Sequence, residues 1–141
     1  MEPQGTFGYI ERTLQRRSIC VCRIRLQLSL VVGGMGRGIS HCLSREGADV
    51  VVADLNLAGA QATVEVVEKN GRKGRAIVAD VASETACQAL VAEALEAFGQ
   101  IDIIVNNAGH FGGKLALPFT NMDEAEWDDN YAVNVKGPFF L

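Results

Sequence analysis

The sequence predicts an α/β fold with a doubly wound parallel sheet, and three features of the 141-residue chain support this prediction. Short runs rich in Val and Ile alternate with longer segments whose apolar residues recur at helical spacing, which is typical of βαβ units. The valine runs are uninterrupted, as in strands covered on both faces. Four such runs joined by right-handed crossovers would pair in the order 3-2-1-4, two-thirds of a 3-2-1-4-5-6 sheet. We therefore expect a fold truncated after about four strands.

The first half of the chain contains two predicted strands and two predicted helices. The first strand covers about residues 26–32 and leads through a glycine-rich loop into a helix that ends near Gly47. The second strand lies in ADVVVADL, residues 48–55. A helix from about Ala58 to Asn70 follows, and Gly71 is placed to end it, because glycine adopts the left-handed conformation without strain.

The second half repeats this alternation. A third strand is predicted in RAIVADV, residues 75–81, and Ser83 is a suitable N-cap for the next helix because its hydroxyl can accept a bond from a free amide. Gly99 lies just beyond the end of that helix. A fourth strand lies in IDIIVNNAG, residues 101–109, and leads into a second glycine-rich loop. The last predicted helix is acidic, begins at Asn121 or Asp123, and contains Trp127, Tyr131 and Val135.

The first 25 residues differ from the rest of the chain. They are rich in arginine and show no sustained period, so we expect residues 1–25 to be a poorly ordered N-terminal extension and residues 26–141 to form a partial α/β domain. The fourth strand, interior in a complete sheet, would be an open edge beside the apolar end GPFFL. We expect a fold that is cut short.

Charge and hydropathy exclude several classes of protein. The net charge of −4 divides into +3 for residues 1–30 and −7 for residues 31–141. An acidic body without a basic stripe argues against nucleic acid as the main partner. No apolar run approaches the roughly 18 residues that span a bilayer, so we expect no membrane segment and a cytoplasmic protein.

The four cysteines do not predict a metal site. Cys20 and Cys22 are two residues apart, which is neither a redox pair nor a zinc spacing, and the chain has only two histidines. Cys42 and Cys87 stand alone. We expect reduced thiols and no bound metal.

A glycine cluster and a following acid indicate a dinucleotide site. Glycines in VVGGMGRG would let the backbone approach a pyrophosphate, which binds the free amides at a helix N-terminus. Asp54 follows Gly34 by 20 residues, the spacing at which a carboxylate accepts hydrogen bonds from the adenosine ribose. Because a carboxylate repels a 2′-phosphate, we expect NAD rather than NADP.

Five features in chain order resemble the short-chain dehydrogenase/reductase family over about residues 28–141. They are the glycine loop, Asp54, Asp80-Val81 after the third strand, Asn106-Asn107-Ala108-Gly109 after the fourth, and Asn134 in NVKGPFF. The resemblance implies a Rossmann-like fold and the NAD(P)-binding part of an oxidoreductase of the alcohol dehydrogenase or ketoreductase type. Such an enzyme exchanges a hydride between a nicotinamide dinucleotide and a small alcohol or ketone.

The resemblance also implies roles for single residues. Asp80 and Val81 would contact the adenine, with helix capping as the alternative for Asp80. Asn107, Ala108 and Gly109 would lie beside the cofactor ribose while Asn106 and Asn107 bond across strands; structural bracing alone is the alternative. Asn134 would hold a relay water on its backbone carbonyl. The expected cofactor-binding residues are Gly33, Gly34, Gly36, Arg37, Gly38, Asp54, Asp80, Val81, Asn107, Ala108 and Gly109.

The glycine loop departs from the family pattern TGxxxGxG, and two alignments are open. With Gly34 as the first glycine and Gly38 as the second, the following helix is about four residues short. Counting back from REGADV instead makes Gly36 the last loop glycine and leaves the helix intact, with the four residues missing from the loop. We favour the second alignment. Either one predicts strongly reduced affinity for the cofactor.

The catalytic residues of the family are also absent. Its chemistry uses a serine and Tyr-x-x-x-Lys, in which the lysine lies one turn above the tyrosine. Here the only tyrosines are Tyr9 and Tyr131, and no serine follows Ser83. Lys136 follows Tyr131 by five residues, which in an α-helix places it well round from the tyrosine. We expect Tyr131 to have a packing role in the helix. His110 and Phe111, in the loop after the fourth strand, are expected at most to line the side of the site where a substrate binds.

Three hypotheses follow. The first is the N-terminal part of an NAD-dependent oxidoreductase that is inactive by itself. The second is a non-catalytic module that binds a nucleotide or a partner protein. The third is a structural subunit that completes its sheet by pairing edges in a homo-oligomer. We favour the first, because an open apolar edge is costly unless other sequence covers it.

Overall fold

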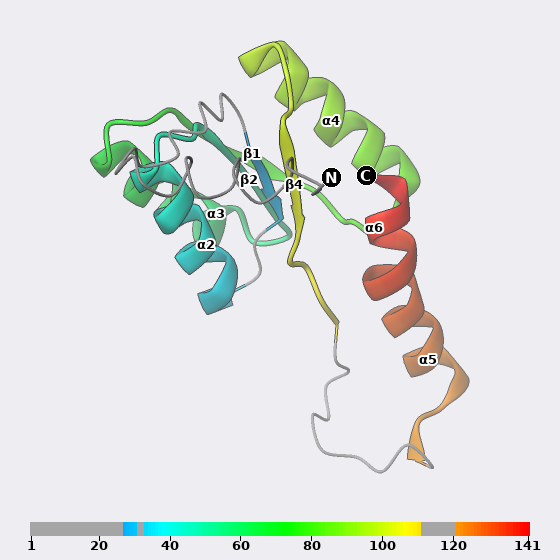
Figure 1. Cartoon of the computed structure of the whole chain (residues 1–141). Coiled ribbons are helices and arrows are strands. Elements are labelled where there is room, and N and C mark those ends of the chain that lie inside the picture. Colours follow the sequence, from blue (N-terminus) through cyan, green and yellow to red (C-terminus); the bar gives the residue numbers. More distant parts are fainter. Residues whose placement is uncertain (1–26, 31–32, 111–120) are drawn as a thin grey trace, which may run out of the picture.

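The computed structural model describes residues 27–30, 33–110 and 121–141. The expected N-terminal extension, Cys20, Cys22, Val32 and Phe111 lie outside the described residues. Within them the chain alternates strand and helix from β1 to β4 and then forms a final helix (Figure 1). The elements are β1 (Gln27–Leu30), α2 (Gly33–Arg45), β2 (Val50–Asp54), α3 (Leu57–Lys69), β3 (Gly74–Val78), α4 (Glu84–Phe98), β4 (Ile103–Asn106), α5 (Glu124–Tyr131), η2 (Ala132–Lys136) and α6 (Gly137–Phe140).

The four described strands form one parallel sheet in the order β3-β2-β1-β4, which confirms the predicted order. At the carboxyl end of β1, Leu30 pairs with Ala53 of β2 and with Asn106 of β4. β4 is at the edge of this sheet, and its Ile104 is 37% exposed. β2, β3 and β4 are shorter than the predicted runs, whose end residues belong to the connections with the flanking helices.

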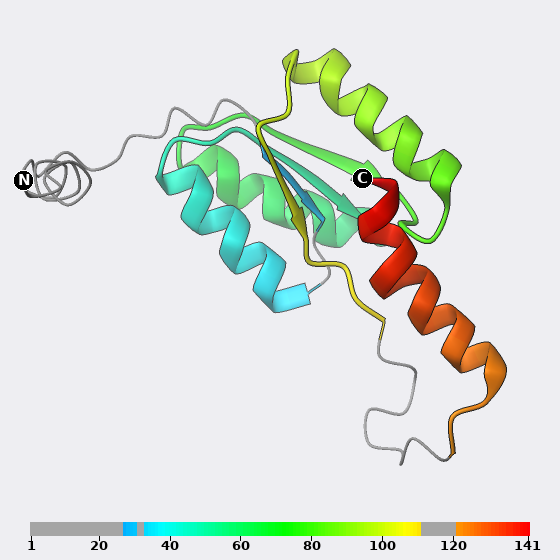
Figure 2. The same cartoon turned by 45° about the vertical axis from the view of Figure 1, so that its right-hand side comes forward.

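Helices cover both faces of the sheet, with α2 and α3 on one side and α4 and α6 on the other (Figures 1 and 2). The side chains of β2 alternate between two cores, since successive residues of a strand point to opposite faces. The α3-side core consists of Ala48, Val50, Val52, Ala60 and Val67. The α4-side core consists of Val51, Ala53, Ile77, Ala79, Val81, Cys87, Leu90 and Ala94.

Several helix ends follow the sequence rules. The hydroxyl of Ser83 accepts a bond from the amide of Ala86 at the start of α4, as predicted. Gly71 and Gly99 have φ angles of 72° and 84° after α3 and α4, the left-handed conformation that favours glycine. Asp123 is the N-cap of α5 and accepts a bond from Glu126, which decides between the two predicted starts.

The predicted glycine loop is not a loop where the structure describes it. α2 begins at Gly33, so Gly34 and Gly36 lie in its first turns rather than before it. The helix has 13 residues, and only positions 31 and 32 separate it from the end of β1. The helix is therefore intact and the connection is short, as in the second alignment, although the helix begins earlier than that alignment predicts.

The last helix contains one turn of π-helix. α5 continues without interruption through η2 into α6, and the amide of Gly137 donates to the carbonyl of Ala132, five residues earlier. α6 packs closely on the α4-side core: a Cβ at the buried Gly137 would lie 3.1 Å from Cγ2 of Val81. The sequence predicted this helix but not its π turn.

Candidate functional site

Three segments converge at the end of the sheet where the carboxyl ends of its parallel strands lie. Asp54 ends β2, the N-terminus of α2 follows β1, and residues 107–110 follow β4. In this strand order the connections leave β1 and β4 toward opposite sides, and ligands of doubly wound sheets bind in the crevice at such a switch point. The structure thus places most of the predicted cofactor residues along one edge.

Asp54 keeps one carboxylate oxygen available. Its Oδ1 accepts the amide of Asn56 at 2.8 Å, and Asn56 in turn caps α3 by accepting the amide of Gly59 at 3.2 Å. Within the described part of the chain Oδ2 has no hydrogen-bond partner, and Asp54 is half-buried. A carboxylate fixed by its own turn can accept two ribose hydroxyls with little rearrangement.

Asp80 and Val81 follow β3 and have different environments. Asp80 is exposed and accepts the amide of Ala82 at 2.9 Å, so it forms the turn before α4 while Ser83 supplies the cap. The helix-capping alternative for Asp80 is therefore wrong, but a turn role is present. The side chain of Val81 is 7% exposed and belongs to the α4-side core, so a ligand can reach little of this side chain.

The N-terminus of α2 presents glycines to open space. A Cβ built on Gly34 or on Gly38 would have no neighbour within 4 Å, whereas Gly36 is buried against the rest of the fold. Arg37 is exposed. The first amides of a helix have no intrahelical acceptor and attract anions, so this end can hold a phosphate. The two-residue connection supplies fewer loop amides than a long glycine loop would.

The segment after β4 carries an unsatisfied donor. The amide of Asn107 donates to the carbonyl of Val105 at 3.0 Å, while its side-chain Nδ2 is buried and has no hydrogen-bond partner among the described residues. Within them, the expected cross-strand bond from Nδ2 is therefore not made. Ala108 and Gly109 are half-buried and continue toward His110.

The side chain of Asn134 bonds to the backbone of His110 as well as to Asn130 of its own helix. Its Oδ1 accepts the amide of His110 at 2.8 Å, and its Nδ2 donates to the carbonyl of His110 at 2.7 Å. The side-chain amide thus pairs with a backbone as a neighbouring strand would. This contact joins η2 to the end of β4 across 24 residues of sequence.

Because residue 138 is proline, the carbonyl of Asn134 lacks the amide partner that it would have in an α-helix. In an α-helix that carbonyl would accept the amide of residue 138, but proline has no N–H. The π turn lies directly before Pro138, where a widened turn moves the proline ring away from this carbonyl. Pro138 is not among the residues expected from the sequence to shape the site, although a proline four residues after Asn134 is a visible signal for such a turn.

The same turn changes the relation between Tyr131 and Lys136. The Nζ of Lys136 lies 5.9 Å from the centroid of the Tyr131 ring, in a cation–π contact. The expectation that Lys136 lies well round the helix is wrong, because a π turn stacks residues five apart. Tyr131 is 46% exposed, so its expected packing in the helix is wrong as well.

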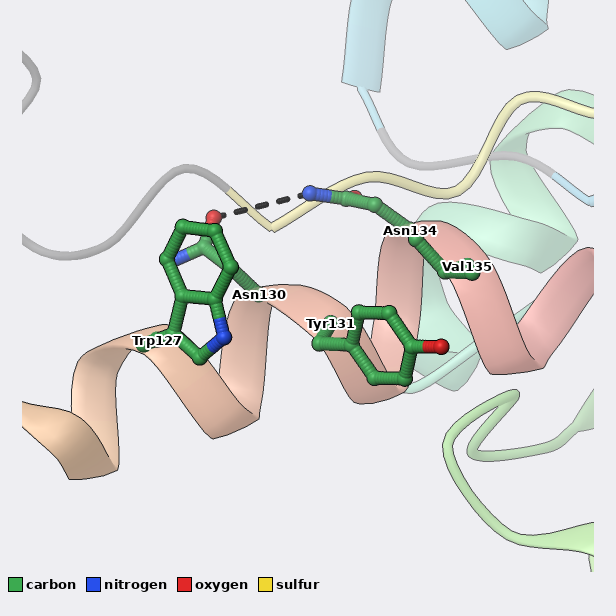
Figure 3. A pocket seen from close by; sticks show the side chains of 5 residues that line it. All are labelled: Trp127, Asn130, Tyr131, Asn134 and Val135. Carbon is green, nitrogen blue, oxygen red and sulfur yellow. Dashed lines mark hydrogen bonds between the residues drawn. The ribbon is translucent and has the colours of Figure 1, made fainter.

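A shallow pocket lies along the side of this helix that carries Asn130 and Asn134 (Figure 3). Its volume is about 170 Å³, below the roughly 300 Å³ at which ligand pockets begin. Trp127 and Tyr131 stand out from the helix, and Asn130 and Asn134 face one another at 3.5 Å. The described lining residues belong to one helix and are Trp127, Asn130, Tyr131, Asn134 and Val135.

Other kinds of site find little support. Burial raises the pKa of the Cys87 thiol, and the negative charge of Asp80 raises it further, so this thiol is an inert core group. The described residues contain no group of three or more His, Cys, Asp or Glu that could hold a metal ion. None of the described helices is long and apolar enough to cross a membrane.

Comparison with known proteins agrees with this geometry. The family model described as enoyl-(acyl carrier protein) reductase matches residues 31–141. Sorbitol dehydrogenase of Cereibacter sphaeroides is 35% identical over 122 residues, which cover 84% of this chain and 45% of that protein. The 3-oxoacyl-acyl-carrier-protein reductase of Staphylococcus aureus is 39% identical over 118 residues, which cover 79% of this chain and 46% of that protein.

A solved structure shows the same arrangement. The 3-ketoacyl-(acyl-carrier-protein) reductase of Brucella melitensis, complexed with NADH, is 32% identical and has a TM-score of 0.74. The match covers 82% of this chain and 46% of that chain. This chain therefore spans about half the length of the relatives that it matches.

Proposed function

Since this chain belongs to the short-chain dehydrogenase/reductase family, we propose that it binds a nicotinamide dinucleotide in the crevice at the carboxyl ends of β1 and β4. The single observation that carries this proposal is the convergence of Asp54, the N-terminus of α2 and residues 107–110 on one edge of the sheet. A carboxylate can bind the hydroxyls of one ribose, and free helix amides can bind a pyrophosphate. A polar strand end can then bind the second ribose.

NAD is the proposed cofactor rather than NADP. The free oxygen of Asp54 suits a pair of ribose hydroxyls, and its charge opposes a 2′-phosphate at the same place. Arg37 and Arg45 both lie on α2 rather than beside Asp54 in sequence. Within the described ranges, neither forms an ion pair with Asp54.

The activity proposed for the family domain is hydride transfer between this cofactor and a small alcohol or ketone. Residues 1–141 contain no Tyr-x-x-x-Lys, which is the proton-transfer pair of that reaction in the family. We therefore expect these residues alone to bind cofactor without turning over a substrate. A cytoplasmic location and a homo-oligomer belong to the same proposal.

A second candidate function is a nucleotide-binding module without catalysis. The specific observation in its favour is the two-residue connection between β1 and α2, which leaves fewer amides for a pyrophosphate than the family loop does. In this case the adenosine half would supply most of the affinity, because Asp54 and the turn at Asp80 are intact.

Titration of the purified chain tests both candidates. Binding of NADH and of ADP is followed by ligand fluorescence and by chemical shifts of backbone amides. We expect saturable binding with a Kd of about 0.1–1 mM, or about −4 to −5.5 kcal/mol. The amides of α2 and of residues 107–110 should shift. Absence of saturation at several times that concentration would refute nucleotide binding, and micromolar affinity would refute the effect ascribed to the short connection.

A further inference from the structure

The turn that follows α3 contains the only Asn-Gly pair of the 141-residue sequence, Asn70-Gly71. An asparagine loses its side-chain amide most readily when glycine follows it, because glycine has no Cβ to hinder attack of its backbone nitrogen on the asparagine side chain. Asn70 is the C-cap of α3, and Gly71 has a φ angle of 72°. This turn therefore holds a pair of residues that can react with one another.

Both reacting groups are engaged in the folded chain. The Nδ2 of Asn70 donates to the hydroxyl of Ser44 at 2.7 Å, and the amide of Gly71 donates to the carbonyl of Glu68 at 2.8 Å. The hydroxyl of Ser44 donates in turn to the carbonyl of His41 at 2.9 Å, so the side chain of Asn70 joins the end of α3 to the end of α2. Asn70 is half-buried and Gly71 is exposed. Water thus reaches the turn, but the two groups can meet only after these bonds open.

The residues beyond Gly71 are held by a different contact. Arg72 pairs with the carboxylate of Asp49 at 2.6 Å, and the amide of Lys73 donates to the same carboxylate at 2.9 Å. The side chain of Asn70 can therefore leave α2 while the chain after it stays attached beside β2. Such a local opening requires much less free energy than unfolding of the whole chain.

We propose that Asn70 is a site of spontaneous deamidation and that its bond to Ser44 sets the rate. In the open turn the backbone nitrogen of Gly71 loses its proton and attacks Cγ of Asn70. The Cγ–Nδ2 bond breaks, and the amino group leaves with a proton as ammonia. Water then opens the resulting succinimide ring at one of its two carbonyls, which leaves aspartate or isoaspartate at position 70. One water is taken up and one ammonia is released, with no oxidation or reduction.

The product weakens the contact that delays its formation. A carboxylate cannot donate to the carbonyl of His41, and it competes with that carbonyl for the proton of the Ser44 hydroxyl. Its negative charge also lies at the C-terminus of α3, where the helix dipole disfavours an anion. Deamidation of Asn70 should therefore loosen α2 from α3 and lower the stability of the fold. This inference is independent of nucleotide binding.

The test follows position 70 while the full 141-residue chain is incubated at neutral and mildly alkaline pH. Digestion and mass spectrometry give the extent of deamidation at each asparagine, and the wild-type chain in urea gives the rate without the fold. Ser44→Ala removes the acceptor of Nδ2. Ser83→Ala is the matched control, since it removes the cap of α4 and leaves the turn after α3 untouched. Thermal unfolding checks that each variant is folded.

The expected rates differ between these samples. Asn70 should react at least about tenfold more slowly in the folded wild-type chain than in urea, because local opening limits the reaction. Ser44→Ala should accelerate it by about 3–10-fold, the effect of one hydrogen bond on the opening, and Ser83→Ala by less than about twofold. Asn121, which is exposed and followed by Met122, should stay intact over the same period.

A second measurement examines the product. Asn70→Asp should lower the midpoint of urea unfolding. Gln61→Glu makes the same change of charge at an exposed position of α3 that is remote from its C-terminus, and should not lower the midpoint. Equal midpoints for Asn70→Asp and the wild-type chain would show that the product does not loosen the helices.

Three results on the rates would overturn the proposal. If Asn70 stays intact both in the folded chain and in urea, it is not a site of deamidation. If the two rates are equal, the fold does not protect it. If Ser44→Ala has no effect, or accelerates the reaction no more than Ser83→Ala does, the bond to Ser44 does not set the rate.

Discussion

The side chain of Asn134 forms two hydrogen bonds with the backbone of His110, one to its amide and one to its carbonyl. This relationship joins a helix face to the end of an edge strand. It occurs where the helix has its π turn, and both partners lie at the edge where the crevice opens. The position of residues 107–110 therefore depends on a side chain that is remote in sequence.

Asn134→Ala should release the end of β4 while leaving the sheet intact. The amide of His110 loses its acceptor, so its hydrogen exchange should accelerate about tenfold or more, which corresponds to about 1.4 kcal/mol of local stability. Exchange is measured by NMR at each amide. In the control Gln88→Ala, the lost bond goes to the carboxylate of Glu84 within α4, so the amide of His110 should keep its rate.

Two serines on the same face of α2 should respond in opposite directions to alanine. Ser40 is fully buried and its hydroxyl has no hydrogen-bond partner in the described part of the chain, so Ser40→Ala should stabilise the fold by about 1 kcal/mol. The hydroxyl of Ser44 accepts Nδ2 of Asn70 at 2.7 Å, so Ser44→Ala should destabilise by about 1 kcal/mol.

Both substitutions gain the same helix propensity, so the difference between them isolates the two hydrogen bonds of the Ser44 hydroxyl, the one from Nδ2 of Asn70 and the one to the carbonyl of His41. Urea unfolding of the two variants beside the wild-type chain gives that difference. Equal changes in the free energy of unfolding would show that the hydroxyl of Ser40 is satisfied as well as that of Ser44.

Pro138→Ala should convert the π turn to α-helix. The new amide at position 138 can donate to the carbonyl of Asn134, which restores the α-helical pattern. Lys136 then moves away from the ring of Tyr131, so the nuclear Overhauser contacts between these two side chains should disappear. Persistence of those contacts in the variant would show that packing of Gly137 on Val81, and not the proline, sets the turn.

Asp54→Asn should reduce the discrimination between NADH and NADPH. Asparagine keeps the acceptor for the amide of Asn56, so the turn should survive, but it removes the charge that opposes a 2′-phosphate. We expect the ratio of the NADPH and NADH dissociation constants to fall about tenfold, or about 1.4 kcal/mol. Glu46→Gln changes the net charge equally at an exposed site after α2 and should leave the ratio unchanged.

Cys87 should make the protein less stable at alkaline pH. Its pKa is raised in the folded state, first by burial and then by Asp80, from an ordinary value of 9.0. Below that value the thiol is protonated in both states and costs nothing. As the pH rises toward the folded pKa, only the unfolded chain ionises, and stability falls by at most about 1.4 kcal/mol per pH unit.

The measurement is urea unfolding of the wild-type chain and Cys87→Ala between pH 7 and the alkaline range. Cys87→Ala should be less stable at neutral pH because of its cavity, yet show a flatter decline. Cys42→Ala, at an exposed position on α2, should keep the wild-type slope. Parallel declines for all three proteins would contradict a role for Cys87.

Local rules predicted much of this fold from the sequence. The valines of β2 are buried on both faces, Ser83 caps its helix, and Gly71 and Gly99 adopt positive φ, because each depends on a few neighbouring residues. The strand order followed from the handedness of crossovers.

Features that depend on distant contacts could not be predicted in the same way. Glycines disfavour helix by intrinsic propensity, yet Gly33 and Gly34 begin α2, with Gly36 buried two residues further on. The bond of Asn134 to His110 spans 24 residues, and no spacing rule encodes it. The contact of Lys136 with Tyr131 was misjudged because it requires the π turn. The roles assigned to the cofactor residues stay predictions.

β2 places buried side chains in both the α3-side core and the α4-side core. A displacement can therefore pass between the two helical layers through the five residues of this strand, Val50–Asp54. Tightening of α2 around an anion would reach α4 as a small displacement of this strand. Amide protection in α4 would then report occupancy of a site on the opposite face of the sheet.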